Sequence, residues 1–186
     1  MIGFALCGSF CTVSRALTEL EALCGEYAVQ GIVSEAVAGT DTRFGRAADT
    51  LARIEKLTGR PVISSIVAAE PLGPKNPLEA LIIAPCTGNT LAKMANGITD
   101  STVTMAAKAH LRAGRPLLLA LSTNDALSAN LQNIGKLLTK KSVYLLPMRQ
   151  DDPRGKPYSL VADFSLLRAG LSGALAGEQM EPLFLS

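Results

Sequence analysis

Short, continuously apolar runs alternate along the chain with longer segments in which apolar residues recur at helical spacing. Six runs have the length of strands: residues 2–7, 28–33, 61–63, 80–84, 116–121 and 143–146. Most of them do not alternate apolar with polar positions, as is typical of strands that other elements cover on both faces. We therefore expect a buried, mainly parallel, six-stranded sheet.

Three segments place apolar residues three or four positions apart, as in amphipathic helices. Their stripes are Val13, Ala16, Leu17, Leu20, Leu23 and Cys24; Leu127, Leu131, Ile134 and Leu138; and Leu160, Phe164, Leu167, Leu171 and Leu175. Strands and helices in alternation predict right-handed crossovers and hence a three-layer, doubly wound α/β fold. Residues 69–77 are too rich in proline for a helix, and residues 147–157 form a charged loop of lid-like length.

Length and composition narrow the class of protein. The 186 residues fit one domain, residues 1–186, because no linker or repeat divides them. The net charge is only +2, without a basic cluster, so nucleic acid is not an expected partner. Four cysteines and one histidine match neither a zinc pattern nor a secreted disulfide framework, and no apolar run reaches the length of a membrane span. We expect a soluble cytoplasmic protein without a metal site.

Candidate binding residues follow the expected strands. In open α/β sheets, ligands bind outside the carboxyl ends of the strands. The residues at these ends are Gly8 and Ser9; Ser34; Pro85, Cys86, Thr87, Asn89 and Thr90; and Ser122 and Asn124. A neutral rim of hydroxyls and amides suits a small molecule with a phosphate and a polar ring. The alternative is that each residue only caps a helix, which contributes about 0.5 to 2 kcal/mol of stability. The first loop is not G-x-G-x-x-G, so no dinucleotide fingerprint is present.

Several motifs, spaced along most of the chain, add a resemblance to a known family. The loop after residue 84 reads Pro85-Cys86-Thr87-Gly88-Asn89-Thr90 and is followed by Ala92, Ala95, Gly97 and Asp100. This pattern resembles the P-A-S-A-N-T loop and A-x-x-A-x-G-x-x-D helix of the homo-oligomeric flavin-containing cysteine decarboxylase superfamily. The stretches GSFCT, GTDTRFG, MRQDDPRGKP and SLVADF are, more narrowly, similar to the family of dipicolinate synthase B subunits.

The resemblance implies a Rossmann-like flavoprotein fold, bound FMN and a role in oxidising a dihydrodipicolinate-pathway intermediate to dipicolinate in the mother cell of a sporulating bacterium. The residues expected at the flavin are Gly8, Ser9, Ser34, Thr42, Phe44, Pro85, Cys86, Thr87, Asn89, Thr90, Ser122 and Asn124. Asn89 and Asn124 are the candidates for catalysis. The expected partners are the A subunit of dipicolinate synthase, which would carry NAD(P), and further copies of this chain in a trimer-based assembly.

The substrate of such a reaction is a pyridine-dicarboxylate precursor, which needs cations. Arg149, Arg154 and Lys156 lie in the charged loop, and arginine can hold a carboxylate through two parallel hydrogen bonds. The alternative is that this loop is solvated and pairs with its own acids.

Two departures from the superfamily pattern leave other functions open. Ser65 stands where the decarboxylases carry a histidine, and residues 121–124 retain only the asparagine of their P-x-M-N segment. An unaided serine is not a general base near neutral pH. A non-catalytic partner of the A subunit therefore remains an alternative, and a decarboxylase or flavin prenyltransferase ranks last.

A histidine, a cysteine and a segment of small residues are each interpreted as packing features. His110 falls on an apolar helical stripe, so we expect a packed, hydrogen-bonded histidine rather than a base. Cys86 is interpreted as a small filler rather than a reactive thiol. The small-residue segment 105–114 allows backbones to approach closely, which we interpret as a contact between copies of the chain.

Overall fold

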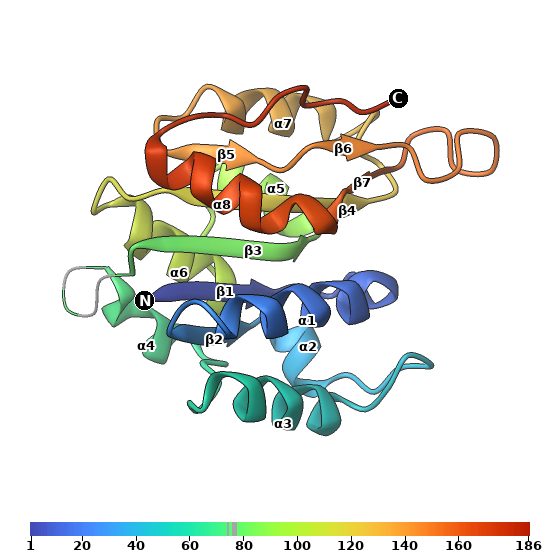
Figure 1. Ribbon diagram of the computed structural model, residues 1–186. Helices are drawn as coiled ribbons and strands as arrows, with labels where there is room; N and C mark the ends of the chain where they lie inside the picture. Colours follow the sequence, from blue (N-terminus) through green and yellow to red (C-terminus); the bar gives the residue numbers. More distant parts are fainter. Residues whose placement is uncertain (74, 76–77) are drawn as a thin grey trace.

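The structure is a computed structural model that describes residues 1–73, 75 and 78–186. Over these residues the strands form one seven-stranded mixed sheet (Figure 1). Its parallel part has the order β2-β1-β3-β4-β5. These strands are β1 (Ile2–Leu6), β2 (Val29–Val33), β3 (Ala80–Cys86), β4 (Leu117–Thr123) and β5 (Val143–Leu145). The α/β, doubly wound fold expected from the sequence is confirmed.

The strand β4 has two different neighbours along one edge. Its first half pairs with β5, whereas Ser122 and Thr123 at its carboxyl end pair antiparallel with β7 (Leu160–Ala162). A short strand β6 (Met148–Arg149) completes this antiparallel ladder. The loop between β6 and β7 projects beyond the carboxyl ends of the parallel strands (Figure 1).

Helices cover both faces of the sheet. One face packs against α1 (Phe10–Cys24), α3 (Ala47–Thr58) and α8 (Leu167–Ala176). The other packs against α4 (Ile66–Ala69), α5 (Gly88–Ala95), α6 (Thr102–Leu111) and α7 (Leu131–Leu138). The short α2 (Glu35–Gly39) follows β2. The 3-10 turn η1 (Glu70–Leu72) follows α4 directly, and the 3-10 turn η2 (Phe164–Leu166) directly precedes α8. In Figure 1, α1 and α8 lie in front of the sheet and α6 lies behind it.

Successive residues of the central strands enter opposite cores. In β1, Phe4 and Leu6 contact the layer of α1 and α8, while Ala5 faces the layer of α5 and α6. Every residue of β1 and β3 is buried. Burial on both faces is the physical reason that these runs are continuously apolar. None of the helices in the described part of the chain is long and apolar enough to cross a membrane.

The expected strand at residues 61–63 is wrong, since only Ile63 bridges to Ile32 of β2. Pro61 has no backbone N–H to donate to a ladder, and Ser65 already caps α4 with its side chain. The sheet instead gains β6 and β7, which brings the number of described strands to seven rather than six. Of the proline-rich segment 69–77, residues 70–72 form η1, and residues 74, 76 and 77 lie outside the described residues.

The expected start of the last helix at Leu160 is also wrong. Leu160–Ala162 is strand β7, and Asp163 then caps the turn η2 by accepting a hydrogen bond from the Ser165 N–H (3.2 Å). The helix α8 therefore begins only at Leu167. Likewise α7 begins at Leu131 rather than near Leu127, because the turn before it is organised by Asp125.

The small residues of α6 serve a contact within the chain. An added Cβ at Gly73 would lie 2.3 Å from the carbonyl oxygen of Ala109, so the backbone after η1 packs directly on α6. The small residues of this segment thus serve packing within the chain, and the contact between copies that we expected from residues 105–114 stays a prediction. His110 of the same helix is buried, and its Nε2 lies 2.8 Å from the Pro116 carbonyl oxygen, as expected of a packed histidine.

Glu35 links α2 to the beginning of α6. Its carboxylate accepts hydrogen bonds from the N–H and the hydroxyl of Thr102, both at 2.8 Å. Burial alone would raise the pKa of Glu35, but hydrogen bonds from its own backbone N–H and from Thr102 outweigh burial and lower the pKa. An anion at a helix N-terminus is also favoured by the helix dipole.

This link predicts a pH-dependent stability. Because the folded-state pKa of Glu35 lies below its usual 4.5, the stabilisation is present above pH 4.5 and is lost as the pH falls through the lowered value. We expect Glu35→Gln to cost about 1 kcal/mol at pH 7 and progressively less below pH 4.5. Urea unfolding across this range measures the difference. Glu178→Gln is the control, since that carboxylate has no hydrogen bond among the described residues; a pH-independent cost at Glu35 would contradict the assignment.

Candidate functional site

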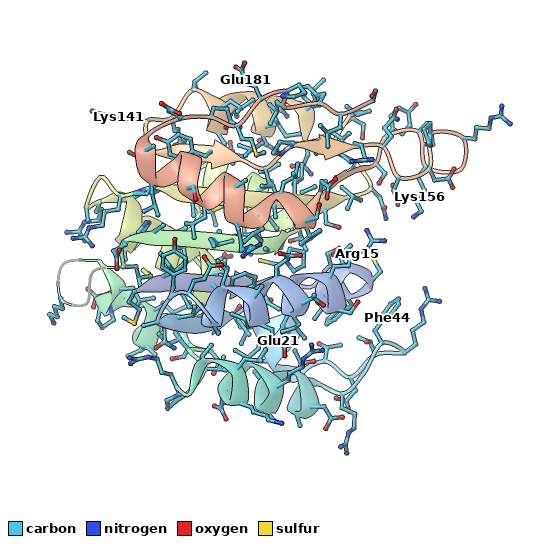
Figure 2. The ribbon with its side chains drawn as sticks, in the orientation of Figure 1. Arg15, Glu21, Phe44, Lys141, Lys156 and Glu181 are labelled. Atoms are coloured by element: carbon cyan, nitrogen blue, oxygen red, sulfur yellow. The ribbon has the colours of Figure 1, made fainter. Side chains whose placement is uncertain are left out.

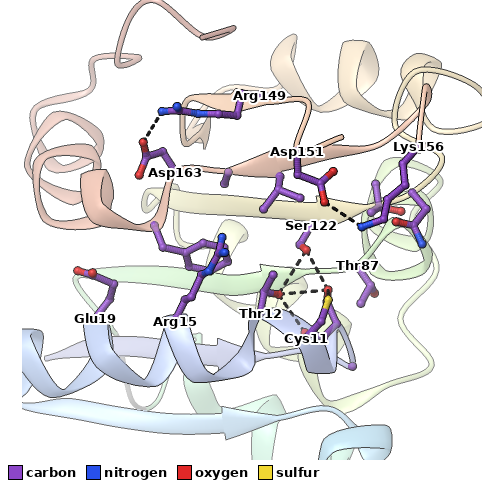
Figure 3. Close-up of a pocket in the computed structure, with 18 of the residues that line it drawn as sticks. Cys11, Thr12, Arg15, Glu19, Thr87, Ser122, Arg149, Asp151, Lys156 and Asp163 are labelled. Atoms are coloured by element: carbon purple, nitrogen blue, oxygen red, sulfur yellow. Dashed lines mark hydrogen bonds and ion pairs between the residues drawn. The ribbon is translucent and has the colours of Figure 1, made fainter. Parts of the chain in front are cut away.

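The sheet topology creates a crevice where β1 and β3 end side by side. From β1 the chain enters α1 on one face of the sheet, and from β3 it enters α5 on the other face. The first residues of both helices line one cavity of about 880 Å³ (Figure 3). Such a volume lies within the usual range for small-molecule and cofactor sites.

Three hydroxyls form the inner wall of this cavity. Ser9 is the N-cap residue of α1, but its side chain makes no capping hydrogen bond. Its Oγ instead lies 2.9 Å from Ser122 Oγ, and Thr12 Oγ1 lies 3.2 Å from Ser9 Oγ and 3.3 Å from Ser122 Oγ. The first N–H groups of a helix have no intrahelical acceptor and favour anions. Hydroxyls and helix N-terminus together make a site suited to a phosphate.

Two asparagines and a threonine form the adjoining wall. Thr87 caps α5 by accepting a hydrogen bond from the Thr90 N–H (3.3 Å). Asn89 and Asn124 are exposed and line the cavity, and neither side-chain amide has a hydrogen-bond partner among the described residues. These amides are therefore available to bind the polar edge of a ring.

A side chain at position 88 would overlap residues at the end of β4 and in the turn after it, so a glycine is required there. The Asp125 carboxylate accepts hydrogen bonds from the Thr123 hydroxyl (2.5 Å) and from the Asn130 amide (2.9 and 3.0 Å). A Cβ at Gly88 would lie 2.5 Å from Thr123 Oγ1, 2.6 Å from Asn130 Nδ2 and 2.7 Å from Asp125 Oδ1. The hydrogen bond from Thr123, supported by Asn130, lowers the pKa of Asp125. This network holds the turn in which Asn124 faces the cavity.

Charged residues form the outer walls. Arg15 and Glu19 project from α1, and opposite them Arg149 of β6 forms an ion pair with Asp163 (2.6 Å) (Figure 3). At the other end of the same wall, Lys156 pairs with Asp151 at 3.0 Å. Figure 2 places Arg15 and Lys156 at the same end of the molecule.

The two acids nearest Arg149 and Arg15 have different pKa shifts. Hydrogen bonds from Ser165 lower the pKa of Asp163, with a smaller contribution from Arg149. The pKa of Glu19 is raised, mainly by burial and further by the charge of Asp163, while Arg168 opposes the shift. Asp163 is thus held as an anion that orients Arg149.

The structure brings together eight of the residues proposed from the sequence. Those that line the cavity are Gly8, Ser9, Thr87, Asn89, Ser122, Asn124, Arg149 and Lys156. Arg154 does not line it, although it belongs to the same loop as Lys156. The inner and outer walls are therefore built from both the strand-end loops and the charged loop.

The remaining candidates lie elsewhere. Ser34 caps α2 by accepting from the Val37 N–H (3.4 Å). Thr42 and Phe44 line a second pocket, of about 300 Å³, on the other side of α1. Pro85, Cys86 and Thr90 are buried behind the cavity, and burial raises the pKa of the Cys86 thiol well above its usual value. Cys86 is thus packed as a filler, as expected.

Sequence reasoning missed the contribution of the first helix. The cavity residues from α1 are Cys11, Thr12, Arg15, Thr18 and Glu19. Positions 11, 15, 18 and 19 recur at helical spacing beside the buried stripe, so they share one face of the helix. This stripe begins next to the Gly8-Ser9 loop, so it could have indicated from the sequence that one face of α1 lines the binding cavity.

Known proteins are similar to the chain over most of its length. A family model described as Flavoprotein matches residues 1–163. The chain is 47% identical over 185 residues to the B subunit of dipicolinate synthase from Bacillus subtilis (strain 168), and the match covers 99% of this chain and 92% of that protein.

Solved structures give the same result. The crystal structure of the B subunit of dipicolinate synthase from Bacillus halodurans C has a TM-score of 0.91 and 43% identity, covering 100% of this chain and 95% of that chain. A dodecameric FMN-dependent UbiX-like decarboxylase from Escherichia coli O157:H7 has a TM-score of 0.60 and 21% identity, covering 79% of this chain and 80% of that chain. The second likeness shows a common fold.

The packing at Gly88 predicts a substitution that the site does not tolerate. We expect Gly88→Ala to destabilise the fold by about 1 to 3 kcal/mol, since the new methyl group overlaps the Asp125 network. In an Asp125→Ala background the added cost becomes smaller, because one of the three overlapping atoms is gone. Urea unfolding of the four variants measures this coupling.

Gly135→Ala is the matched control, since a Cβ there meets no atom within 4 Å. It stabilises or leaves unchanged the helix α7. Additive costs of Gly88→Ala and Asp125→Ala would show that the glycine is not required by this network.

Proposed function

The chain belongs to the Flavoprotein family and, within it, to the family of dipicolinate synthase B subunits, and from this we propose that it binds FMN and takes part in forming dipicolinate. The reaction would be the oxidation of a dihydrodipicolinate-pathway intermediate during sporulation. One observation carries the proposal: the N-termini of α1 and α5 meet at one large cavity. The side-chain amides of Asn89 and Asn124, which have no hydrogen-bond partner among the described residues, line the same cavity.

The residues of the cavity fit the phosphate and the ring of a flavin. Ser9, Thr12 and Ser122, together with the N-terminus of α1, would hold the phosphate, because hydroxyl and free helix N–H groups donate hydrogen bonds to an anion. Asn89 and Asn124 would bind the polar edge of the ring. When bound, FMN supplies a two-electron acceptor for substrate oxidation.

The outer part of the cavity would hold the pyridine-dicarboxylate precursor. Arg149 and Lys156 lie on its wall, so they are the substrate-binding residues we favour, whereas Arg154 lies outside it. These cations would orient the carboxylates of the substrate.

Partners follow from the same family assignment. Membership in a family of B subunits implies that an A subunit exists, to which we assign the NAD(P) site, because this chain has no dinucleotide fingerprint. A homo-oligomer, which we expect to be trimer-based, is supported by the dodecamer among the proteins of the same fold. The proposed place of action is the cytoplasm of the mother cell.

One observation favours a second role, that of a non-catalytic partner of the A subunit. Ser65, which replaces the decarboxylase histidine, caps α4 through a hydrogen bond from the Ala68 N–H (3.2 Å) and does not line the cavity. In that role the chain would bind FMN without passing substrate through it.

The hydroxyl cluster predicts the first test. Removing Ser122 Oγ and Ser9 Oγ one at a time should weaken FMN binding by roughly 10- to 100-fold each, since a hydrogen bond to a charged group contributes about 1.5 to 3 kcal/mol. Fluorescence titration of FMN with Ser9→Ala and Ser122→Ala measures this change. Ser172→Ala on α8 is the control. Unchanged affinity in both variants would remove the cluster from the flavin site.

Reconstitution distinguishes the two roles. Purified chain is combined with the A subunit in the presence and in the absence of FMN, and dipicolinate formation is followed by its ultraviolet absorbance. A catalytic role predicts product only with this chain and FMN together. Full activity of the A subunit in the absence of this chain would indicate an accessory role, and no flavin uptake by this chain would reject FMN binding altogether.

A further inference from the structure

Arg15 differs from the other cations of the cavity. Arg149 is paired with Asp163, and Lys156 is paired with Asp151. Among the residues that the structure describes, Arg15 has neither an ion-pair partner nor a hydrogen-bond partner. It is exposed on α1 and lines the cavity, so its guanidinium is available to a ligand.

The surroundings of Arg15 define where such a ligand would lie. Arg15 rises from α1 into the space between this helix and the wall that carries Arg149 and Asp163 (Figure 3). Asp163 holds Arg149 at 2.6 Å and is itself held by the Ser165 hydroxyl at 2.6 Å. Arg149 donates one hydrogen bond to Asp163 through its Nη2. An arginine has five N–H donors, so the other donors of Arg149 are available to a second anion.

Two guanidinium groups on opposite walls are suited to an anion with two separated charges. Each carboxylate of a planar dicarboxylate matches the paired N–H donors of one arginine. Resting on the function proposed above, we propose that Arg15 and Arg149 form a clamp in which each arginine binds one carboxylate of the substrate. Arg15 then determines the preference for a dicarboxylate over a monocarboxylate.

Glu19 is the acid nearest to this clamp along α1. It follows Arg15 by four residues, so the two side chains lie on the same helix face, yet no ion pair joins them in the described structure. The negative charge of Glu19 opposes anion binding beside Arg15. Removing that charge therefore strengthens the binding of a dicarboxylate, opposite to the effect of removing Arg15.

The test compares two ligands that differ by one carboxylate, pyridine-2,6-dicarboxylate and pyridine-2-carboxylate. Isothermal titration calorimetry of the full chain, with and without FMN, should give at least a tenfold preference for the dicarboxylate. We expect Arg15→Gln to lose most of this preference by weakening only the dicarboxylate. Arg15→Lys keeps the charge and retains part of it, and Glu19→Gln binds the dicarboxylate a few-fold more tightly.

Arg112→Gln is the matched control, because Arg112 is an exposed arginine outside the cavity. Thermal unfolding verifies that each variant is folded. The clamp is overturned if Arg15→Gln keeps the wild-type preference, if it weakens both ligands equally, or if the wild-type chain binds neither ligand. Loss of FMN affinity in Arg15→Gln with an unchanged ligand preference would also overturn it, since Arg15 would then belong to the phosphate site.

These outcomes are separate from those of the proposed function. FMN uptake and dipicolinate formation are measured without reference to ligand preference, so the function can stand when the clamp fails. Conversely, a chain that prefers the dicarboxylate through Arg15 but takes up no FMN would retain the clamp and reject the flavin.

Discussion

The position of the site depends on a single topological constraint, the adjacency of β1 and β3 in a parallel sheet. From these two strands the chain departs to opposite faces, so α1 and α5 begin at the same edge and diverge. Among the described elements, no crossover covers the space between the N-termini of α1 and α5. The hydroxyls, the asparagines and the charged walls are all arranged around that space.

Helix capping and ligand binding compete for the same residue types, and the hydrogen bonds distinguish them. Ser34, Ser65 and Thr87 each accept a hydrogen bond from a backbone N–H of the helix that follows, so their hydroxyls already serve stability. Ser9 and Ser122 bond to each other rather than to a helix terminus. The paired hydroxyls that cap nothing are therefore those best placed for a phosphate.

The cavity divides into a neutral part and a charged part. Near the sheet, its donors are hydroxyls, amides and helix N–H groups, which suit a cofactor phosphate and ring. Farther out, acids hold Arg149 and Lys156 in place while Arg15 stays available. Each acid pairs with its cation at the wall, whereas Arg15 has no such partner among the described residues.

The sequence by itself determined the layered α/β fold, the central strands and the loops at their carboxyl ends, because apolar periodicity and strand-end chemistry are local properties. It also indicated Ser9, Asn89 and Asn124 as candidate binding residues, and all three line the cavity. Only the tertiary structure decided that residues 160–162 form a strand, since that strand exists through its pairing with β4. The same holds for Arg15, which lines the cavity with Arg149 because β6 and β7 lie opposite α1. Pairings between residues far apart in the sequence, such as Ser122 with Val161, leave no signature in local periodicity.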